Sequence, residues 1–290
     1  MPGADTLSYV VGTVAQVWRY PVKSMGGERL PAVTLTDRGL EGDRGFAVLD
    51  VASGKILSAK KERRLLLASA RTCPDNGVLV RLPGGTELEA GDPRLDQCLS
   101  GWLGRASRLV RPLPGQRALF EKVLDDEDEE ANGATKELAT QPGVFFDTKS
   151  ALHVLTTASL RAAHRLYPEG DWDVRRFRPN LLVDTAGTGT GDEGFPEEAW
   201  PGGTLTLGEA TAWVRKATPR CSMTTRPQGT LPEDRGIHRT LARLHHNILG
   251  ALAHPAGRTV VHVGDTLRLT PGQPSRPEAG RANLSDSTYF

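Results

Sequence analysis

The sequence has little of what would specify a secreted, membrane-spanning or nucleic-acid-binding protein. It contains only three cysteines in 290 residues, and their spacing matches neither a disulfide framework nor a zinc site. It has no run of about 20 apolar residues that could cross a bilayer. Its N-terminus has no basic region followed by a cleavage site, and the net charge of +1 gives no overall field that would attract nucleic acid or a membrane surface. We therefore expect a soluble protein of a reducing, cytoplasmic compartment, with no nucleic-acid or membrane partner.

The first third of the chain consists of short apolar runs separated by turn residues. This pattern is typical of strands, and residues 12–20 in particular alternate with period two and end at Pro21. Asp92 followed by Pro93 predicts the start of a short helix, with Cys98 as one of its core residues. The other expected strands are residues 32–36, 45–50, 54–59, 65–70 and 78–82, of which 45–50 and 54–59 form a hairpin.

The second half of the chain alternates helices and strands. Thr157 is expected to cap an amphipathic helix over residues 158–167, and another helix is expected over residues 239–252. The expected strands are residues 151–156, 181–185, 203–208, 209–217, 258–264 and 265–270, the last two as a pair. Because strands outnumber helices, the predicted fold is mainly β and barrel-like with packed helices, that is, α+β.

Charge and composition divide the chain into parts. Residues 125–130 read DDEDEE, so residues 125–143 are expected to form an acidic linker or loop; a docking patch for a basic redox partner is the alternative. The linker separates an N-terminal β-barrel-like domain over residues 10–124 from a second domain over residues 144–272. Residues 273–290 are polar and rich in proline and glycine, which predicts a disordered tail.

Three motifs resemble known sites but each lacks a part. Residues 189–194 have the G-x-G-x-x-G spacing, but Pro196 follows where a dinucleotide site needs a helix, so a flexible loop is favoured. Cys221 and Arg226 are one residue too close for a phosphatase loop. Residues 245–246 are adjacent histidines that would point in different directions on a helix, so a metal site is not favoured.

Cys221 is the cysteine whose position suggests chemistry. It lies on a polar loop between Arg220 and Ser222, just after an apolar run, whereas cysteine is ordinarily buried as a small hydrophobe. The neighbouring Arg220 would lower the pKa of the thiol and favour the thiolate.

Several other groups suit the binding of an anion. Arg178 offers a bidentate guanidinium fork and Asn180 an amide with donors and an acceptor. Lys23, Ser24 and Arg44 add charge and a hydroxyl at turns. Together with Cys221, these groups suit a phosphate-bearing pterin and one soft metal.

At these residues the sequence resembles a known family. It is similar to MOSC-domain proteins that carry the β-barrel N-terminal domain, such as the mitochondrial amidoxime-reducing component and its bacterial relatives. The C-terminal domain of eukaryotic molybdenum-cofactor sulfurases is also related. The resemblance covers roughly residues 10 to 272, and its motifs are YPVKSMGG, GLEGDRGFAVLD, SALHVLTTASL, RFRPNLLVD, EEAW, TPRCSMTT and GDTLRL. It implies a MOSC β-barrel next to a β-rich N-terminal domain.

The resemblance also implies roles for particular residues. In these reductases a molybdenum cofactor (molybdopterin) is bound between the two domains and a cysteine ligates the metal; Cys221 occupies that cysteine's position. The positions matching family residues that hold the pterin and its phosphate are Lys23, Ser24, Arg44, Arg178, Asn180 and Arg220, with Ser150 and Thr156 completing the implied set.

The implied activity is a molybdenum-cofactor oxidoreductase that reduces N-oxygenated, for example N-hydroxylated, small molecules. No C-x4-C-x2-C motif follows Cys221, so electrons would come from a separate flavin or iron–sulfur reductase. The chain is too short for a pyridoxal-phosphate desulfurase domain, so pyridoxal phosphate is not expected. The alternatives are a molybdenum-cofactor carrier or sulfur-transfer protein in which Cys221 holds a persulfide, and a binding module that keeps the fold without the chemistry.

Overall fold

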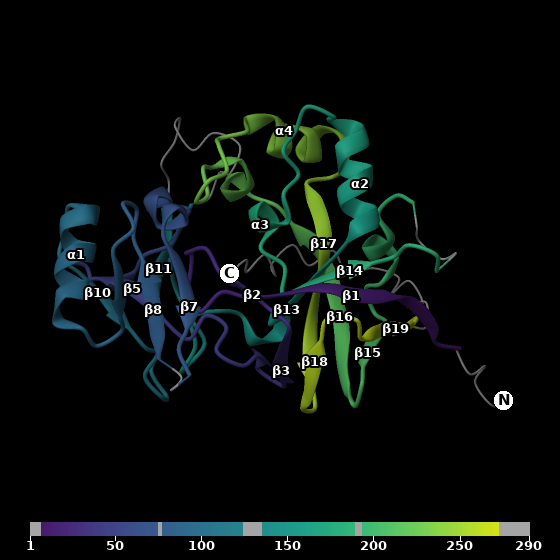
Figure 1. Cartoon of the computed structure of the whole chain (residues 1–290), viewed down its shortest axis with the longest axis horizontal. Coiled ribbons are helices and arrows are strands. Elements are labelled where there is room, and N and C mark those ends of the chain that lie inside the picture. The colour runs from purple at the N-terminus through teal and green to yellow at the C-terminus, as the bar shows by residue number, and fades with distance from the viewer. Residues whose placement is uncertain (1–6, 75–76, 124–134, 189–192, 273–290) are drawn as a thin grey trace, which may run out of the picture.

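The computed structural model describes residues 7–74, 77–123, 135–188 and 193–272 (Figure 1). Within these ranges strands predominate and four α-helices pack against them, which confirms the predicted mainly β fold class. No helix in these ranges is long and apolar enough to cross a membrane. The acidic run 125–130, the tail from residue 273, Gly189 and Gly191 lie outside the described residues.

The largest sheet has eight strands and closes into a barrel, because β1 pairs with β19 on one side and with β14 on the other. Its strands are β1 (Tyr9–Arg19), β2 (Glu28–Leu30), β13 (Leu152–Thr156), β14 (Leu181–Asp184), β15 (Thr204–Leu207), β16 (Ala210–Pro219), β17 (Ile248–Ala256) and β19 (Thr266–Thr270). Inward-facing residues such as Val14, Leu205 and Ala253 form one buried apolar cluster. The barrel is therefore filled by side chains.

Strand β1 brings the N-terminal part of the chain into this barrel. The strand was predicted from the sequence and is confirmed, but its buried residues do not alternate strictly: Val11, Val14 and Val17 face the core three residues apart, because the pairing shifts register along the strand. A Cβ at Gly12 would overlap the carbonyl oxygen of Asp184 on β14, so glycine allows the two strands to approach closely. After β1 the chain leaves the barrel at Pro21, and residues 22–27 run towards a second β-rich part.

The second β-rich part lies beside the barrel, on the left in Figure 1. It contains the five-stranded sheet β10-β5-β6-β11-β12 and the three-stranded sheet β7-β8-β9. Its elements are β5 (Ala47–Asp50), β6 (Lys55–Ile56), η1 (Arg63–Leu67), β7 (Ser69–Thr72), β8 (Val78–Arg81), β9 (Glu87–Glu89), α1 (Pro93–Leu103), β10 (Ser107–Val110), β11 (Leu119–Val123) and β12 (Thr135–Ala139). The predicted hairpin of β5 and β6 is confirmed, and so is helix α1, which Asp92 caps by accepting a hydrogen bond from the Arg94 amide. Cys98 is partly buried against the core of this part.

A small third sheet, β18-β3-β4, corrects one prediction. It consists of β3 (Ala32–Thr36), β4 (Gly39–Leu40) and β18 (Thr259–His262). Residues 258–264 and 265–270 do contain strands, but they do not pair with each other: β18 pairs with β3, and β19 pairs with β1 and β15. Long-range pairing here replaces the local hairpin that the turn at Gly264 suggested.

Helices α2 (Thr157–Leu166) and α4 (Arg235–Leu244) cover one end of the barrel, at the top of Figure 1. The N-cap of α2 is Thr156 rather than Thr157, since the Thr156 hydroxyl accepts the Ser159 amide. The predicted helix 239–252 was wrong in its second half. His246 and Asn247 both adopt left-handed backbone conformations, which end the helix, and β17 begins at Ile248.

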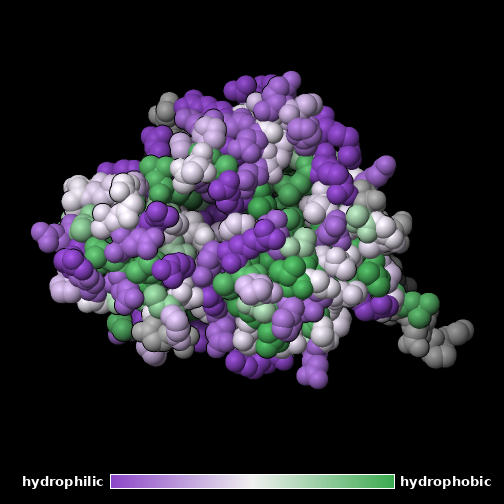
Figure 2. All heavy atoms as spheres, viewed as in Figure 1, coloured by the Kyte–Doolittle hydropathy of each residue, from purple (hydrophilic) through white to green (hydrophobic). Residues whose placement is uncertain are grey.

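Hydrophilic side chains cover most of the face seen in Figure 2, with apolar patches scattered between them. No single apolar patch on this face therefore marks a binding site. The predicted domain boundaries 10–124 and 144–272 stay a prediction.

Candidate functional site

Cys221 lies at the end of β16, immediately before the short 3-10 turn η4 (Ser222–Thr225), and is half-buried. The carbonyl of Cys221 accepts hydrogen bonds from the amide of Thr224 (3.2 Å) and from its hydroxyl (3.1 Å). The carbonyl of Met223 accepts from the Gln228 side chain at 3.1 Å. Because these carbonyls are bound on the protein side, the turn that follows Cys221 is held in one conformation.

Arg176 holds the far end of this turn from a neighbouring segment. It belongs to the short helix α3 (Val174–Phe177), and only 1% of the residue is exposed. Its guanidinium donates to the carbonyls of Thr224 and Arg226 at 3.4 and 3.5 Å and to that of Pro232 at 2.8 Å. The sequence analysis did not single out Arg176, although it is the first arginine of the RFRPN motif.

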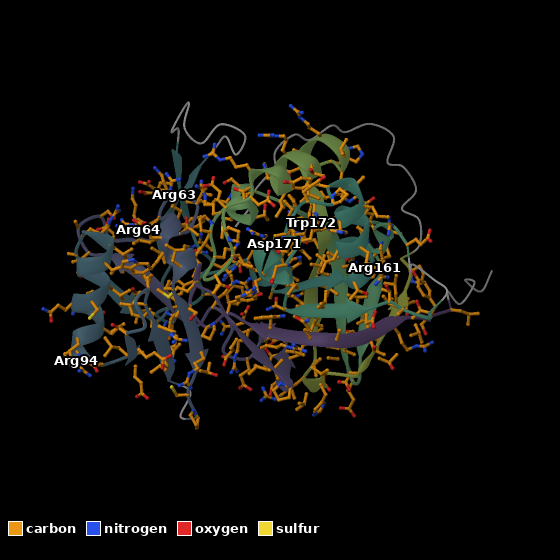
Figure 3. All side chains as sticks on the ribbon, turned by 45° about the horizontal axis from the view of Figure 1, so that its top comes forward. Arg63, Arg64, Arg94, Arg161, Asp171 and Trp172 are labelled. Atoms are coloured by element: carbon orange, nitrogen blue, oxygen red, sulfur yellow. The ribbon has the colours of Figure 1, made fainter. Side chains whose placement is uncertain are left out.

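The carboxylate partner of Arg176 is Asp171, which accepts from Nη2 at 3.0 Å. Asp171 and the adjacent Trp172 lie near the middle of the view in Figure 3, and the Asp171 side chain is partly exposed. Trp172 in turn stacks on Phe177, with ring centroids 5.9 Å apart. Helix α3 is thus packed on one side and hydrogen-bonded to the Cys221 turn on the other.

Arg220, the residue before Cys221, is buried and directed into the protein. Its Nε donates to the carbonyl of Leu249 at 2.9 Å, and its Nη1 donates to the carbonyl of Phe177 at 3.1 Å. Its Nη2 lies 2.7 Å from Nε2 of His153. Burial lowers the pKa of Arg220 to about 10, while the nearby Cys221 opposes that shift. In this arrangement Arg220 anchors the backbone next to Cys221. Because its guanidinium is bonded to protein groups, Arg220 would act on a bound ligand through its charge.

Two of the predicted cations lie over the ring of Tyr20, and a third, Lys23, is close enough to interact with their charges. The guanidinium of Arg178 lies 4.2 Å from the centroid of the Tyr20 ring, and that of Arg44 lies 5.7 Å from it. Lys23 is half-buried, and its ammonium donates to the Phe145 carbonyl at 2.8 Å. We call Lys23, Arg44 and Arg178 the cation cluster.

The pKa values show that these cations act on one another. Burial, followed by the charges of Arg44 and Arg178, lowers the pKa of Lys23 to about 8. Burial also lowers the pKa of Arg178 to about 10, with Arg44 adding to the shift. The cluster therefore concentrates positive charge where solvent is largely excluded, and an anion bound there would relieve the repulsion.

Asp43 and Asn180 lie beneath the cation cluster. The Asp43 carboxylate forms an ion pair with Arg44 and accepts from the Tyr20 amide at 2.7 Å and from the Asn180 side chain at 3.2 Å. Asn180 is fully buried, and its side-chain oxygen accepts the His153 amide at 3.1 Å. Its side chain thus contacts protein groups and positions the strands that carry the cluster.

Ser24 is placed next to the cluster but faces the protein. It adopts a left-handed backbone with φ 70°, is buried, and its hydroxyl accepts the Ala59 amide at 2.9 Å. This bond ties the segment that carries Lys23 to residues 57–62 of the second β-rich part.

Ser150 and Thr156 contact other groups than the cluster. The Ser150 hydroxyl accepts from Arg215 at 3.2 Å. Thr156 is fully buried, and its amide donates to the carboxylate of Glu197 at 2.6 Å. Thr156 lies three residues beyond His153 on β13, roughly 10 Å along the strand. The structure therefore gathers Lys23, Arg44, Arg178, Asn180, Arg220 and Cys221 in one connected network, whereas Ser150 and Thr156 form hydrogen bonds with Arg215 and Glu197.

The adjacent histidines form no metal-binding group. His245 stacks on Phe195 and lies 2.6 Å from a carboxylate oxygen of Glu198. Over the ranges that the structure describes, no three His, Cys, Asp or Glu side chains are grouped as ligands for a metal ion.

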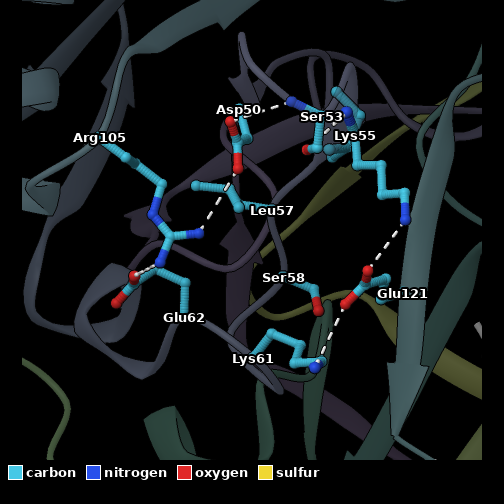
Figure 4. Close-up of a pocket in the computed structure, with 10 residues that line it drawn as sticks. Asp50, Ser53, Lys55, Leu57, Ser58, Lys61, Glu62, Arg105 and Glu121 are labelled. Carbon is cyan, nitrogen blue, oxygen red and sulfur yellow. Dashed lines mark hydrogen bonds and ion pairs between the residues drawn. The ribbon is translucent and has the colours of Figure 1, made fainter. Parts of the chain in front are cut away.

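A separate cavity of about 350 Å³ lies in the second β-rich part (Figure 4). Its charged lining residues are Asp50, Lys55, Lys61, Glu62, Arg105 and Glu121. Arg105 lies 3.5 Å from both Asp50 and Glu62, and Glu121 pairs with both lysines. Because its acidic and basic groups are paired with each other, this cavity has no excess charge of one sign with which to attract a ligand.

Two family models match this sequence, and several known proteins are similar to it. The MOSC N-terminal beta barrel domain matches residues 11–96 and the MOSC domain matches residues 141–268. The mitochondrial amidoxime reducing component 2 of Bos taurus is 27% identical over 253 residues, which cover 77% of this chain and 69% of that protein. The molybdenum cofactor sulfurase of Drosophila grimshawi is 26% identical over 244 residues, covering 78% of this chain but 29% of that protein. The crystal structure of the YUAD protein from Bacillus subtilis aligns with a TM-score of 0.44 and 9% identity, over 92% of this chain and 98% of that chain. The chain is a MOSC-domain protein that also carries the MOSC N-terminal beta barrel domain.

Proposed function

We propose that this protein is a molybdenum-cofactor-dependent oxidoreductase that reduces N-oxygenated, for example N-hydroxylated, small molecules. The observation that carries the proposal is the connection between the cation cluster and the Cys221 turn. Arg176 and Arg220 both donate hydrogen bonds across the two segments, Arg176 to the Cys221 turn and Arg220 to the carbonyl of Phe177 just before Arg178. An anion-binding group and a thiol are thus held together by one rigid unit.

The cation cluster suits the phosphate group of molybdopterin. Lys23 provides a compact charge, while Arg44 and Arg178 provide planar forks that match phosphate oxygens. Tyr20 and Asp43 fix these side chains without neutralising the whole cluster. Ser24, Asn180 and Arg220 would support the cofactor indirectly, by positioning the segments that touch it.

Cys221 would be the protein's ligand to molybdenum. A thiolate is a soft ligand, and this metal carries sulfur ligands from the pterin. The electrostatic interaction between Arg220 and Cys221 favours the ionised thiol that a metal requires. When bound, the cofactor would supply the two-electron chemistry that removes the oxygen atom from the substrate.

The amidoxime reducing component is named for an activity on N-oxygenated compounds, and its similarity to this chain supports the choice of substrate class. Electrons would reach the site from a separate flavin or iron–sulfur reductase. The three cysteines form no disulfide and lie in separate places, which is not the grouping that an iron–sulfur cluster needs. We further propose that the protein works in a reducing, cytoplasmic setting.

The proposal is tested by loading and turnover. Purified protein, reconstituted with molybdenum cofactor, is assayed for bound metal and pterin and then for reduction of an N-hydroxylated base with an artificial electron donor. We expect cofactor retention and turnover. A protein that retains the cofactor but does not reduce the substrate would contradict the reductase assignment.

The second candidate is a molybdenum-cofactor carrier or sulfur-transfer protein. It is favoured by the similarity to the molybdenum cofactor sulfurase, which extends over 78% of this chain. Here Cys221 would carry a persulfide instead of binding the metal. A persulfide donor would transfer its outer sulfur to the Cys221 thiolate and leave as a thiol, so mass spectrometry after incubation with such a donor would find one extra sulfur atom on Cys221. The turnover assay would then find no reduction of the substrate.

A further inference from the structure

His153 lies at the centre of the network that connects the two halves of the site, namely the cation cluster and the Cys221 turn. It belongs to β13, and 6% of the residue is exposed. Its Nε2 is 2.7 Å from Nη2 of Arg220, and its Nδ1 is 3.3 Å from the carbonyl oxygen of Arg178. One imidazole thus contacts the residue before Cys221 and the residue that provides a cation of the cluster.

The chemistry of its neighbours determines which nitrogen carries the proton. A guanidinium can only donate, so Nε2 must accept and carries no hydrogen. A carbonyl oxygen can only accept, so Nδ1 must carry the hydrogen and donate it. Both contacts are satisfied together only by the neutral imidazole with its proton on Nδ1. Burial and the charge of Arg220 keep the pKa of His153 well below its ordinary value, in agreement with a neutral ring.

The surroundings hold the ring in this place. Asn180 fixes the backbone of His153 on both sides, since its amide donates to the His153 carbonyl at 2.8 Å and its side chain accepts the His153 amide at 3.1 Å. Gly250, with φ +85°, leaves room for the ring, because a Cβ there would lie 2.7 Å from Nε2. The ring therefore has little room to move.

Each contact restrains a different half of the site. On one side, Nε2 holds the guanidinium of Arg220, which also donates to the carbonyls of Phe177 and Leu249, and so restrains the start of the Cys221 turn. On the other side, Nδ1 holds the carbonyl of Arg178, whose backbone is left-handed with φ 53° at the end of α3. A non-glycine residue in that conformation requires support from its surroundings.

We propose that His153 is a positioning residue that couples the two halves of the site, with Nε2 fixing Arg220 beneath the Cys221 turn and Nδ1–H fixing the backbone that directs Arg178 into the cation cluster. The identity of the ligand rests on the proposed function, but the coupling is a property of the chain itself. His153 touches neither substrate nor cofactor in this role.

Two substitutions separate the two contacts. His153→Asn places an amide donor near the position of Nδ1, and His153→Gln places an amide oxygen near the position of Nε2. Two readouts on cofactor-free protein report on the two halves: the affinity for inorganic phosphate reports on Arg178, and hydrogen–deuterium exchange of residues 220–226 reports on the Cys221 turn.

We expect opposite patterns. His153→Gln should weaken phosphate binding roughly tenfold and leave exchange of residues 220–226 close to wild type. His153→Asn should accelerate that exchange roughly tenfold and keep the phosphate affinity. The matched control is His164→Gln on the exposed side of α2, which should change neither readout. Equal losses of both readouts in both variants would indicate a merely structural residue and would overturn the proposal, as would two variants that match wild type.

A second measurement needs no substitution, which matters because a buried imidazole can be required for folding. Nitrogen-15 NMR of histidine-labelled wild-type protein at neutral pH should show His153 neutral, with the proton on Nδ1. A proton on Nε2 would overturn the proposal, because that nitrogen could not then accept from Arg220. If wild-type protein binds no phosphate, the cation cluster of the proposed function is wrong, and the exchange and NMR results still decide the coupling.

Discussion

The guanidinium of Arg178 stacks on the ring of Tyr20, with 4.2 Å between the guanidinium carbon and the ring centroid. Tyr20 is buried, and its hydroxyl donates to the carbonyl of Pro179 at 3.2 Å. Burial raises the pKa of Tyr20, so the ring stays neutral and keeps that bond. The end of β1 and the end of α3 are thus joined by two contacts, and the first of them orients a cation towards the proposed phosphate site.

Arg178→Ala should weaken the binding of phosphate and of molybdenum cofactor without unfolding the protein. Losing a hydrogen bond that involves a charged group costs roughly 1.5–3 kcal/mol, or about 10- to 150-fold in affinity. Calorimetric titration with inorganic phosphate measures the change, and the melting temperature reports on the fold. The matched control is Arg175→Ala on the same helix, since Arg175 pairs with Asp173 and has a 42% exposed side chain. Equal phosphate affinity in wild type and Arg178→Ala would contradict the assignment.

Anion binding should weaken as the pH rises through the pKa of Lys23, which is about 8 instead of the ordinary 10.5. Above that pH the ammonium loses its proton and its charge, while the neighbouring Arg44 and Arg178 stay charged. Sulfate is the better probe here because it remains divalent throughout. We expect its affinity to fall roughly tenfold between about pH 7 and about pH 9.

Lys23→Gln is the control for this pH dependence, and its sulfate affinity should be low and flat over the same range. A wild-type affinity that does not change with pH would contradict a charged Lys23 in the site. The lowered pKa of Lys23 also predicts how the stability of the protein depends on pH. Between about pH 8 and pH 10.5 the unfolded chain binds the Lys23 proton and the folded chain does not, so this group's contribution to the free energy of unfolding rises with pH.

Gly250→Ala should destabilise the protein more than the same substitution at a comparable glycine in open space. Gly250 has φ +85°, and a Cβ there would lie 2.7 Å from Nε2 of His153 and 2.8 Å from the carbonyl of Val154. Gly84 has φ +92° with nothing within 4 Å of a Cβ. Both substitutions share the backbone strain of about 1–2 kcal/mol, and only Gly250→Ala adds the clash. Urea denaturation of the two variants measures the difference, and equal losses would show that the His153 pocket is looser than described.

The sequence predicted much of the fold because many of its strands and helices have local signals. Most of residues 12–20 form strand β1, and Asp92 and Pro93 begin α1, as expected. The sequence failed where a distant contact decides the structure. No local pattern in residues 239–252 predicts that His246 and Asn247 both adopt the left-handed conformation. The side chain of Asn247 donates a hydrogen bond to the carbonyl of Arg220 at 2.7 Å, a contact with a residue far along the chain.

The sequence identified only part of the network that forms the candidate site. Family motifs pointed to the cation cluster and Cys221, and the structure places them in one network. Tyr20, Asp43, His153 and Arg176 were missed, because a buried polar residue has no pattern of its own in a single sequence. Their roles come from partners far along the chain, such as His153 with Arg220. Asn180 and Arg220 were expected to face a ligand, and the structure directs their side chains to protein groups.

The proposed reductase activity should need a partner protein. NAD(P)H alone should give no turnover with cofactor-loaded enzyme, since the described residues include no pair of thiols or cluster ligands that could pass electrons. Adding a flavin or iron–sulfur reductase should start turnover, which a spectrophotometric assay of NAD(P)H oxidation would follow. Robust activity with NAD(P)H and no added protein would contradict this prediction. It would favour the alternative of a dinucleotide site at the glycine-rich residues 189–194.

The central claim is that Cys221 is the ligand to molybdenum, and Cys221→Ser tests it most directly. A serine hydroxyl is a weaker acid and a harder ligand than a thiol, so it binds this metal poorly. The cation cluster is unchanged by the substitution, so the pterin should be retained in large part. Cys73→Ser and Cys98→Ser are the matched controls, since Cys98 packs against the core of the second β-rich part and neither lies in the site network. The measurement is reduction of an N-hydroxylated substrate by cofactor-loaded protein, together with the thiolate-to-molybdenum absorption band. We predict that Cys221→Ser loses both while the two controls keep both; reduction by Cys221→Ser at the wild-type rate would contradict the account and favour the persulfide or binding-module alternatives.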